Sequence, residues 1–290
     1  MKAIKIGIQY ILTIILIITI LAYFFIILIS NTILKKEYIM SKIESTNYYS
    51  KIYKNVKSNF EKYIEQSGFE KSILENIVSE EKVKNDTQTI INNIYDGTNK
   101  EVDTQEIKDK INQNILETFE DKKINITQQN AIDTFVAHIC NEYTETISHF
   151  SFEDQINQIY QKAIEYINIA KKIIIIFIIL DILLLFMINL KKIHKFVSLI
   201  GISLSATGIL LIITNLFINA KIKIQTIIIL NNAISDILIN ILTEILNVMA
   251  RNGAYLLTFG IILIFLANLI YNIKETRTKE NCWRRKKWKN

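Results

Sequence analysis

One acidic residue in the middle of an apolar stretch is the strongest candidate for chemistry in this sequence. Asp181 stands in residues 173–190, where Asn189 is the other polar residue. A carboxylate at the centre of a bilayer costs about 2.5 kcal/mol or more, so such groups face a bundle interior or a water-filled path. The expected hydrogen-bonding partners are polar residues of later apolar runs: Ser205, Thr214, Asn215, Thr258 and Asn268.

Three interpretations of Asp181 follow from this placement. It is a proton or ion site, a charge that pairs with another subunit, or a protonated acid that donates a hydrogen bond between helices. A proton relay needs several acidic groups, and a single acid does not form one. The protonated acid that donates a hydrogen bond is therefore slightly favoured over the two functional interpretations.

A second group has spacing that resembles a set of metal ligands. His138, Glu142, Glu145 and His149 stand at i, i+4, i+7 and i+11, so they share one face of a helix. A histidine and a carboxylate four residues apart can bind zinc, but all four together extend over about 16 Å. Ordinary i,i+4 pairs on a solvated flank are therefore the favoured interpretation, and we expect no bound metal or other cofactor.

The C-terminal tail combines cations with two indole rings. Each cation near an anionic leaflet contributes about 1 kcal/mol of attraction, and Trp prefers the headgroup region. Because nucleic-acid binding would need a folded domain beside such a tail, we expect it to contact anionic inner-leaflet lipids instead. The residues are Trp283, Arg284, Arg285, Lys286, Lys287 and Trp288.

Sequence motifs for catalysis are missing. The chain contains no phosphate-binding glycine loop, no Gly-x-Ser-x-Gly elbow and no His-Glu-x-x-His. We therefore expect a protein that is not an enzyme.

The elements that must position these residues are all expected to be helices. The chain has no proline and seven glycines, whereas sheet-rich folds depend on turns made by these residues. Its apolar residues gather in four blocks, each near the length of about 20 residues that a helix needs to cross a bilayer. The predicted class is therefore all-α: a four-span integral membrane protein with an extracytoplasmic helical bundle between the first two spans.

Charge predicts how these spans are oriented. Lysines and arginines gather at residues 191–195 and in the tail, while residues 33–172 carry 18 basic and 23 acidic residues. Because positive charge is enriched on the cytoplasmic side, both termini are predicted to be cytoplasmic, in a plasma membrane. The predicted parts are a cytoplasmic N-terminus at 1–5, a first span at 6–31, an outer domain at 32–171, a second span at 172–190, a cytoplasmic turn at 191–195, a third span at 196–219, an outer amphipathic helix at 220–252, a fourth span at 253–273 and a basic tail at 274–290.

The outer domain shows apolar stripes at helical spacing, with stop signals between them. One stripe begins at Tyr49 and ends at Ser67-Gly68, and another ends at Asp96-Gly97. Residues 103–106 have the spacing of a capping box. The last stripe is expected to continue from the bundle into the second span. The later amphipathic segment is expected either to lie in the membrane interface or to pack under the bundle.

Residues 47–68 and the stretch from Leu74 to Val78 resemble a group of uncharacterised clostridial-type, low-GC Gram-positive membrane proteins. The resemblance covers about the first two thirds of the chain. It implies an N-terminal anchor, an extracytoplasmic helical region and further spans, and it implies no particular activity.

Three hypotheses for function remain open. The first is a non-enzymatic bacterial envelope protein whose outer bundle binds a protein, an envelope component or a second copy of the chain. The second is a transporter or channel subunit that uses Asp181. The third, a membrane enzyme, has little support from the residues present.

Overall fold

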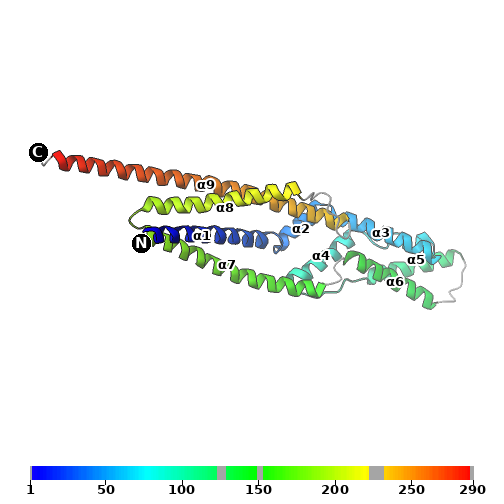
Figure 1. Ribbon diagram of the computed structural model, residues 1–290. Coiled ribbons are helices and arrows are strands. Elements are labelled where there is room, and N and C mark those ends of the chain that lie inside the picture. The colour runs from blue at the N-terminus through cyan, green and yellow to red at the C-terminus, as the bar shows by residue number, and fades with distance from the viewer. Residues whose placement is uncertain (1, 123–128, 149–152, 222–231, 288–290) are drawn as a thin grey trace. The chain divides into compact units, whose positions relative to one another are not determined.

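The computed structural model consists of helices throughout the part of the chain that it describes, residues 2–122, 129–148, 153–221 and 232–287 (Figure 1). In chain order the elements are α1 (Lys2–Asn31), α2 (Lys36–Ser45), α3 (Tyr48–Ser67), the short 3-10 helix η1 (Lys71–Leu74), α4 (Glu80–Asp96), α5 (Gln105–Asp121), α6 (Gln129–Ile147), α7 (Glu153–Asn189), α8 (Ile193–Lys221) and α9 (Asn232–Lys287).

The chain divides into two compact units. The first, here called the membrane unit, comprises Met1–Ile33, Tyr166–Ile227 and Ile239–Asn290. The second, here called the bundle, comprises Leu34–Glu165 and Ile228–Leu238. The long helices α7 and α9 each contribute residues to both units.

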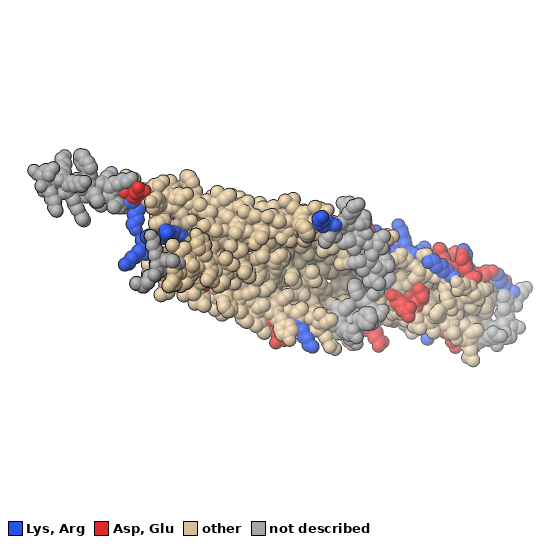
Figure 2. Space-filling view, viewed as in Figure 1, with Lys and Arg blue, Asp and Glu red and all other residues tan. Residues whose placement is uncertain are grey.

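Four helices of the described chain are long and apolar enough to cross a membrane, which confirms the predicted number of spans. These stretches are Ile4–Asn31, Gln158–Asn189, Ile193–Lys221 and Asn232–Thr276. Large apolar side chains such as Phe177, Phe217 and Phe265 are more than half exposed, as expected where lipid is the surrounding medium. In Figure 2 the surface of the membrane unit is accordingly an almost uninterrupted area without charged residues.

The bundle has an apolar core of its own, built around α3. This helix packs against α2, η1, α4 and α6, and α5 packs against η1 and α6. The core residues recur every three or four positions, so each helix presents one apolar stripe inward. Fully buried examples are Ile52 and Val56 of α3, Ile107, Ile111 and Ile115 of α5, and Ile139 and Tyr143 of α6.

The predicted stop signals end helices as expected. Gly68 follows α3 with φ of 77°, and Gly97 follows α4 with φ of 70°. This left-handed conformation is easily adopted by glycine and closes the end of a helix. The side chain of Asn93 then holds the turn after Gly97, because its amide donates to the Lys100 carbonyl oxygen at 2.8 Å.

The predicted capping box at residues 103–106 forms only in part. The Asp103 carboxylate accepts a hydrogen bond from the Gln105 backbone N–H at 2.8 Å, at the start of α5. The carboxylate of Glu106 pairs instead with Lys110, at 2.8 Å. This i,i+4 ion pair keeps the glutamate on the helix surface and lowers its pKa.

Helices α7 and α9 each continue without a break at a position where the sequence suggests a boundary between two parts of the chain. As predicted, α7 runs without a break from bundle residues into an apolar span. Unlike the prediction, residues 232–252 do not form a separate helix, because α9 continues through Gly253 to Lys287. Its first turn packs in the bundle core through Ala233 and Ile234. Gly253 lies within this helix, where it packs closely against the backbone of α8.

Candidate functional site

Asp181 lies on the buried face of α7 inside the membrane unit. Its exposed fraction is 4%, and Leu185 and Asn189, which follow at i+4 and i+8 on the same face, are also buried. Neither carboxyl oxygen of Asp181 has a hydrogen-bonding partner among the described residues. An ionised carboxylate in this setting would be strongly unfavourable, so the group is either protonated or neutralised by a cation.

The burial of Asp181 argues against one of the three earlier interpretations, a charge that pairs with another subunit. A helix of another subunit would approach from the lipid-facing surface, which is occupied by residues such as Phe177 and Leu184. The carboxyl group faces the interior of its own unit, so it does not present a charge to a neighbouring subunit. An interior proton or cation site and a protonated structural acid remain.

Polar contacts connect α1 to α7 and to α8. The Gln9 side-chain amide of α1 donates to Asn189 Oδ1 of α7 at 2.5 Å. The Ser203 hydroxyl of α8 donates to the Thr13 carbonyl oxygen of α1 at 3.4 Å. Asp181 lies eight residues from Asn189, which corresponds to about 12 Å along α7. The carboxyl group is therefore deep in the span, beyond these contacts.

The partners predicted for Asp181 make other contacts. Asn215 donates to the Leu246 carbonyl oxygen at 2.7 Å and so joins α8 to α9. Thr214 and Thr258 are exposed and bond to carbonyl oxygens of their own helices. Asn268 lines a pocket of the membrane unit formed by α1, α8 and α9. None of these side chains hydrogen-bonds to Asp181 in the described structure.

Ser205 belongs to a face on which α8 and α9 touch. Its side chain is 9% exposed, and its oxygen lies so close to Gly260 that a Cβ added there would be 2.3 Å away. A Cβ added to Gly201 or Gly208 of α8 would lie 2.8 Å from the Gly260 carbonyl oxygen or 2.5 Å from the Gly253 carbonyl oxygen, respectively. The small residues on this face thus allow two backbones to approach closely.

The residues with metal-ligand spacing make ordinary contacts within the bundle. The His138 ring packs on the Tyr63 ring, with centroids 4.5 Å apart. Glu142 accepts a hydrogen bond from the Asn59 side chain at 2.9 Å, and Glu145 is exposed. Within the described chain no group of three or more histidine, cysteine or acidic side chains is placed to hold a metal ion. His149 lies outside the described residues.

The side chains of residues 277–290, which include the tail's Trp and Arg residues, lie outside the described part of the structure. Helix α9 continues to Lys287, so Trp283 and the four cations that follow it are helical. Trp288 lies outside the described residues. Contact between this tail and lipid therefore stays a prediction.

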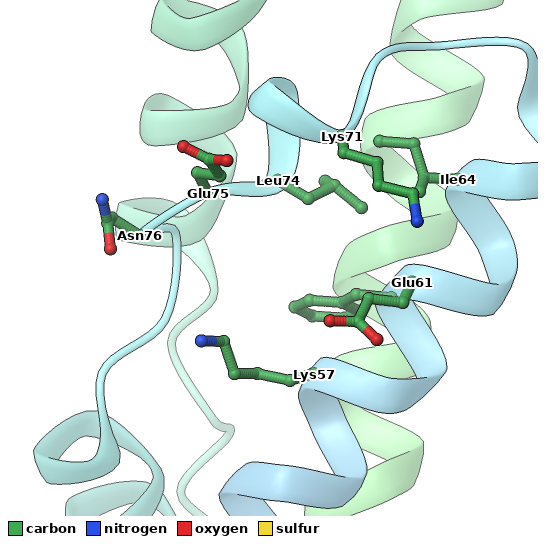
Figure 3. Close-up of a pocket in the computed structure, with 8 residues that line it drawn as sticks. Lys57, Glu61, Ile64, Lys71, Leu74, Glu75 and Asn76 are labelled. Atoms are coloured by element: carbon green, nitrogen blue, oxygen red, sulfur yellow. The ribbon is translucent and has the colours of Figure 1, made fainter.

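The bundle carries a groove that the sequence did not predict. Figure 3 shows one side formed by α3, with Lys57 and Glu61, and the other formed by η1 and the loop after it. The groove has a volume of about 350 Å³ and is lined by Lys57, Phe60, Glu61, Ile64, Lys71, Leu74, Glu75 and Asn76. Phe60 and Ile64 are buried and form its apolar floor, while the charged side chains are exposed at its rim.

The loop wall of this groove is fixed by contacts outside it. The Asn114 side chain of α5 donates to the Ile73 and Glu75 carbonyl oxygens, at 3.0 and 3.2 Å. Lys122 forms an ion pair with Glu70 at the other end of the segment. Asn76 has φ of 55°, a left-handed conformation that asparagine tolerates better than most residues. The groove is consequently held in shape by the folded bundle.

Comparisons with known proteins do not assign this arrangement to a family. No family model, curated protein or solved structure matches the chain. The resemblance to clostridial-type membrane proteins therefore stays a prediction, and function must be argued from the molecule itself.

The groove could not be predicted from the sequence, and the reason is physical. Its walls come from two segments, and only the apolar floor residues Phe60 and Ile64 leave a periodic signal. That signal is the same for a groove floor as for ordinary core. The left-handed Asn76 and the bonds from Asn114 shape the loop, and neither follows from spacing along the chain.

Proposed function

We propose that this chain is a non-enzymatic membrane protein whose bundle lies outside the cytoplasm and binds a segment of a protein partner through the groove on α3. The observation that carries the proposal is the groove itself, with an apolar floor between charged rims and a loop wall held by Asn114. Its volume of about 350 Å³ lies in the range typical of binding pockets.

The chemistry of the groove favours a peptide over a small charged ligand. Lys57 and Lys71 on the rim offer ammonium donors, while Glu61 and Glu75 offer carboxylate acceptors. A peptide presents both kinds of group on its backbone and charged side chains, and it can place an apolar side chain over Phe60 and Ile64. A ligand of one charge would meet repulsion from half of this rim.

Orientation supports a partner outside the cytoplasm. The exposed lysines of the membrane unit include Lys191 and Lys192 in the short connection between α7 and α8, and Lys195 in the first turn of α8. A connection rich in lysine is retained in the cytoplasm. The bundle helices α2–α6 stand one span earlier in the chain, so they fall on the opposite side.

Site-specific photocrosslinking in cells tests this proposal. A photoreactive residue placed at Glu61, on the rim of the groove, is expected to form an adduct with one external partner. The same residue at Asn85, an exposed position on α4 outside the groove, serves as the matched control and is expected to form no such adduct. The double charge reversal Lys57→Glu with Glu61→Lys should weaken capture by a probe placed at Asn76.

Two results would count against groove binding. One is equal capture of the same partner from Glu61 and Asn85, which would indicate contact through another surface. The other is unchanged capture after the charge reversal, provided that the variant keeps the helical content of the wild type.

A second candidate function is supported by Asp181. We infer that a buried carboxyl group without a partner could serve transport of a proton or small cation across the membrane unit. Purified protein in liposomes would then conduct protons or cations, and Asp181→Asn would abolish the flux while the protein still assembled normally. Flux that persists in this variant, or no flux under any imposed gradient, would refute the transport role.

A further inference from the structure

A second pocket lies within the membrane unit, between α1, α8 and α9. It has a volume of about 430 Å³. Its lining consists of Ile6, Gln9, Tyr10, His194, Lys195, Ser198, Leu199, Ile202, Ala267, Asn268 and Tyr271. None of these described lining residues is acidic. The pocket is basic and polar around Lys195 and His194, and apolar around Leu199 and Ile202.

The polar and apolar parts are separated along α8. Lys195 lies near the start of this helix, Ser198 follows about one turn later, and Ile202 follows one turn after that. From Lys195 to Ile202 the helix advances about 10 Å. A ligand in the pocket would thus meet charge at the end of the span and hydrocarbon deeper within it.

The charged part of the pocket is suited to a phosphate. Lys195 provides a cation, His194 and Asn268 provide nitrogen donors, and Tyr10 and Ser198 provide hydroxyl groups. The His194 ring packs against the Tyr271 ring, with centroids 5.1 Å apart, which holds the imidazole at the rim. These are the donor types that bind phosphate oxygens through charge-assisted hydrogen bonds.

The surroundings increase the attraction for an anion. Lys5, Lys191, Lys192 and Lys274 are also exposed in this part of the membrane unit. Lys274 of α9 reaches the Lys191 carbonyl oxygen at 3.3 Å, so α9 and the connection before α8 meet there. Basic pockets between membrane helices are known to bind anionic lipid headgroups.

We propose that this pocket is a binding site for an anionic phospholipid, with the headgroup phosphate at Lys195 and His194 and an acyl chain along Leu199 and Ile202. The apolar half distinguishes a lipid from free phosphate, because a soluble phosphate would leave this half unfilled. The site is separate from the groove of the bundle and from the C-terminal tail, and it does not depend on the function proposed above.

Lipid retention by the purified full-length protein tests the site. Native mass spectrometry after detergent extraction would compare phosphatidylglycerol with phosphatidylcholine of the same acyl chains, and with glycerol 1-phosphate as the soluble source of phosphate. The wild type is expected to retain phosphatidylglycerol and to release the other two. The double variant Lys195→Gln with His194→Gln should weaken that retention by about tenfold or more, as expected for lost hydrogen bonds to a charged group.

Two further variants separate this pocket from general electrostatics. Lys192→Gln removes an equal charge three residues before Lys195 without touching the pocket lining, so it should retain lipid like the wild type. Ile202→Trp fills the apolar half and should release lipid without any change of charge. Equal retention of both phospholipids, equal losses in Lys192→Gln and the double variant, or full retention in Ile202→Trp would each overturn the proposal, and equal binding of glycerol 1-phosphate would reduce it to a phosphate site.

Discussion

At the scale of single residues, a partly buried polar network joins helices of the bundle. The Tyr143 hydroxyl of α6 donates to Asp86 Oδ2 of α4 at 2.5 Å, and Lys82 lies 3.1 Å from the same oxygen. Lys82 also donates to the Asp103 carbonyl oxygen at 2.8 Å. Burial, together with the neighbouring Asp86, raises the pKa of Tyr143, so the phenol stays a proton donor throughout the physiological range. The network therefore joins α4, α6 and the start of α5.

Removal of the Tyr143 hydroxyl should destabilise the bundle measurably. Tyr143→Phe deletes the donor to Asp86, and the expected loss is about 1–2 kcal/mol of unfolding free energy. Cys140, on the same helix, is buried and has a raised thiol pKa because of that burial. In a Cys282→Ser background, labelling of Cys140 by a maleimide would thus report opening of α6, and it should become about 5–30 times faster.

The matching control deletes a hydroxyl that is exposed. Tyr166→Phe changes a side chain that is 67% exposed on α7, so labelling of Cys140 should keep its wild-type rate. Equal rates in wild type and Tyr143→Phe would show that the Asp86 hydrogen bond does not stabilise α6.

At the scale of helices, α8 and α9 pack closely against each other in the membrane unit. A Cβ atom added to Gly208 would lie 2.5 Å from the Gly253 carbonyl oxygen and 2.6 Å from the Leu257 nitrogen. Both are backbone atoms, so a larger residue could enter only if the helices moved apart. The two glycines are therefore required by the contact rather than by a turn.

Gly208→Ala should lower the thermal stability of the protein in detergent. Overpacking of this kind typically costs about 1–3 kcal/mol, and loss of helicity on heating would measure it. Gly7→Ala is the matched control, because a Cβ at Gly7 meets no atom within 4 Å. Alanine also favours a helix over glycine, so the control should keep or slightly raise the melting temperature. A Gly208→Ala variant as stable as this control would contradict the close contact.

The helices were largely predictable from the sequence, as was the unbroken run of α7 into its span, but the continuity of α9 was not. The stripe ending at Ser67-Gly68 became α3 with its left-handed glycine because spacing and stop signal are both local. Gly253 stands at an expected boundary but serves the close contact of α9 with Gly208 of α8, and this contact leaves no signal in the local sequence. Glu106 had two local options, the capping position and the i,i+4 pair with Lys110, and spacing alone does not choose between them.

At the scale of the whole chain, hydropathy was the most informative property. Four long apolar runs predicted the four candidate spans because a bilayer demands length and apolar character from each helix separately. Ligand sites obey no such rule. The lipid pocket combines residues from near the N-terminus, from α8 and from α9, and their proximity arises only when these helices pack together.

The central claim is that a four-span anchor holds the bundle outside the cytoplasm, and thiol accessibility in intact cells tests it most directly. In a background of Cys140→Ala and Cys282→Ser, single cysteines would be introduced by Asn85→Cys in the bundle and Lys192→Cys between α7 and α8, both at exposed positions. A membrane-impermeant maleimide should label the Asn85→Cys variant in intact cells and the Lys192→Cys variant only after permeabilisation. Labelling of the Lys192→Cys variant in intact cells, with the Asn85→Cys variant protected, would contradict the account.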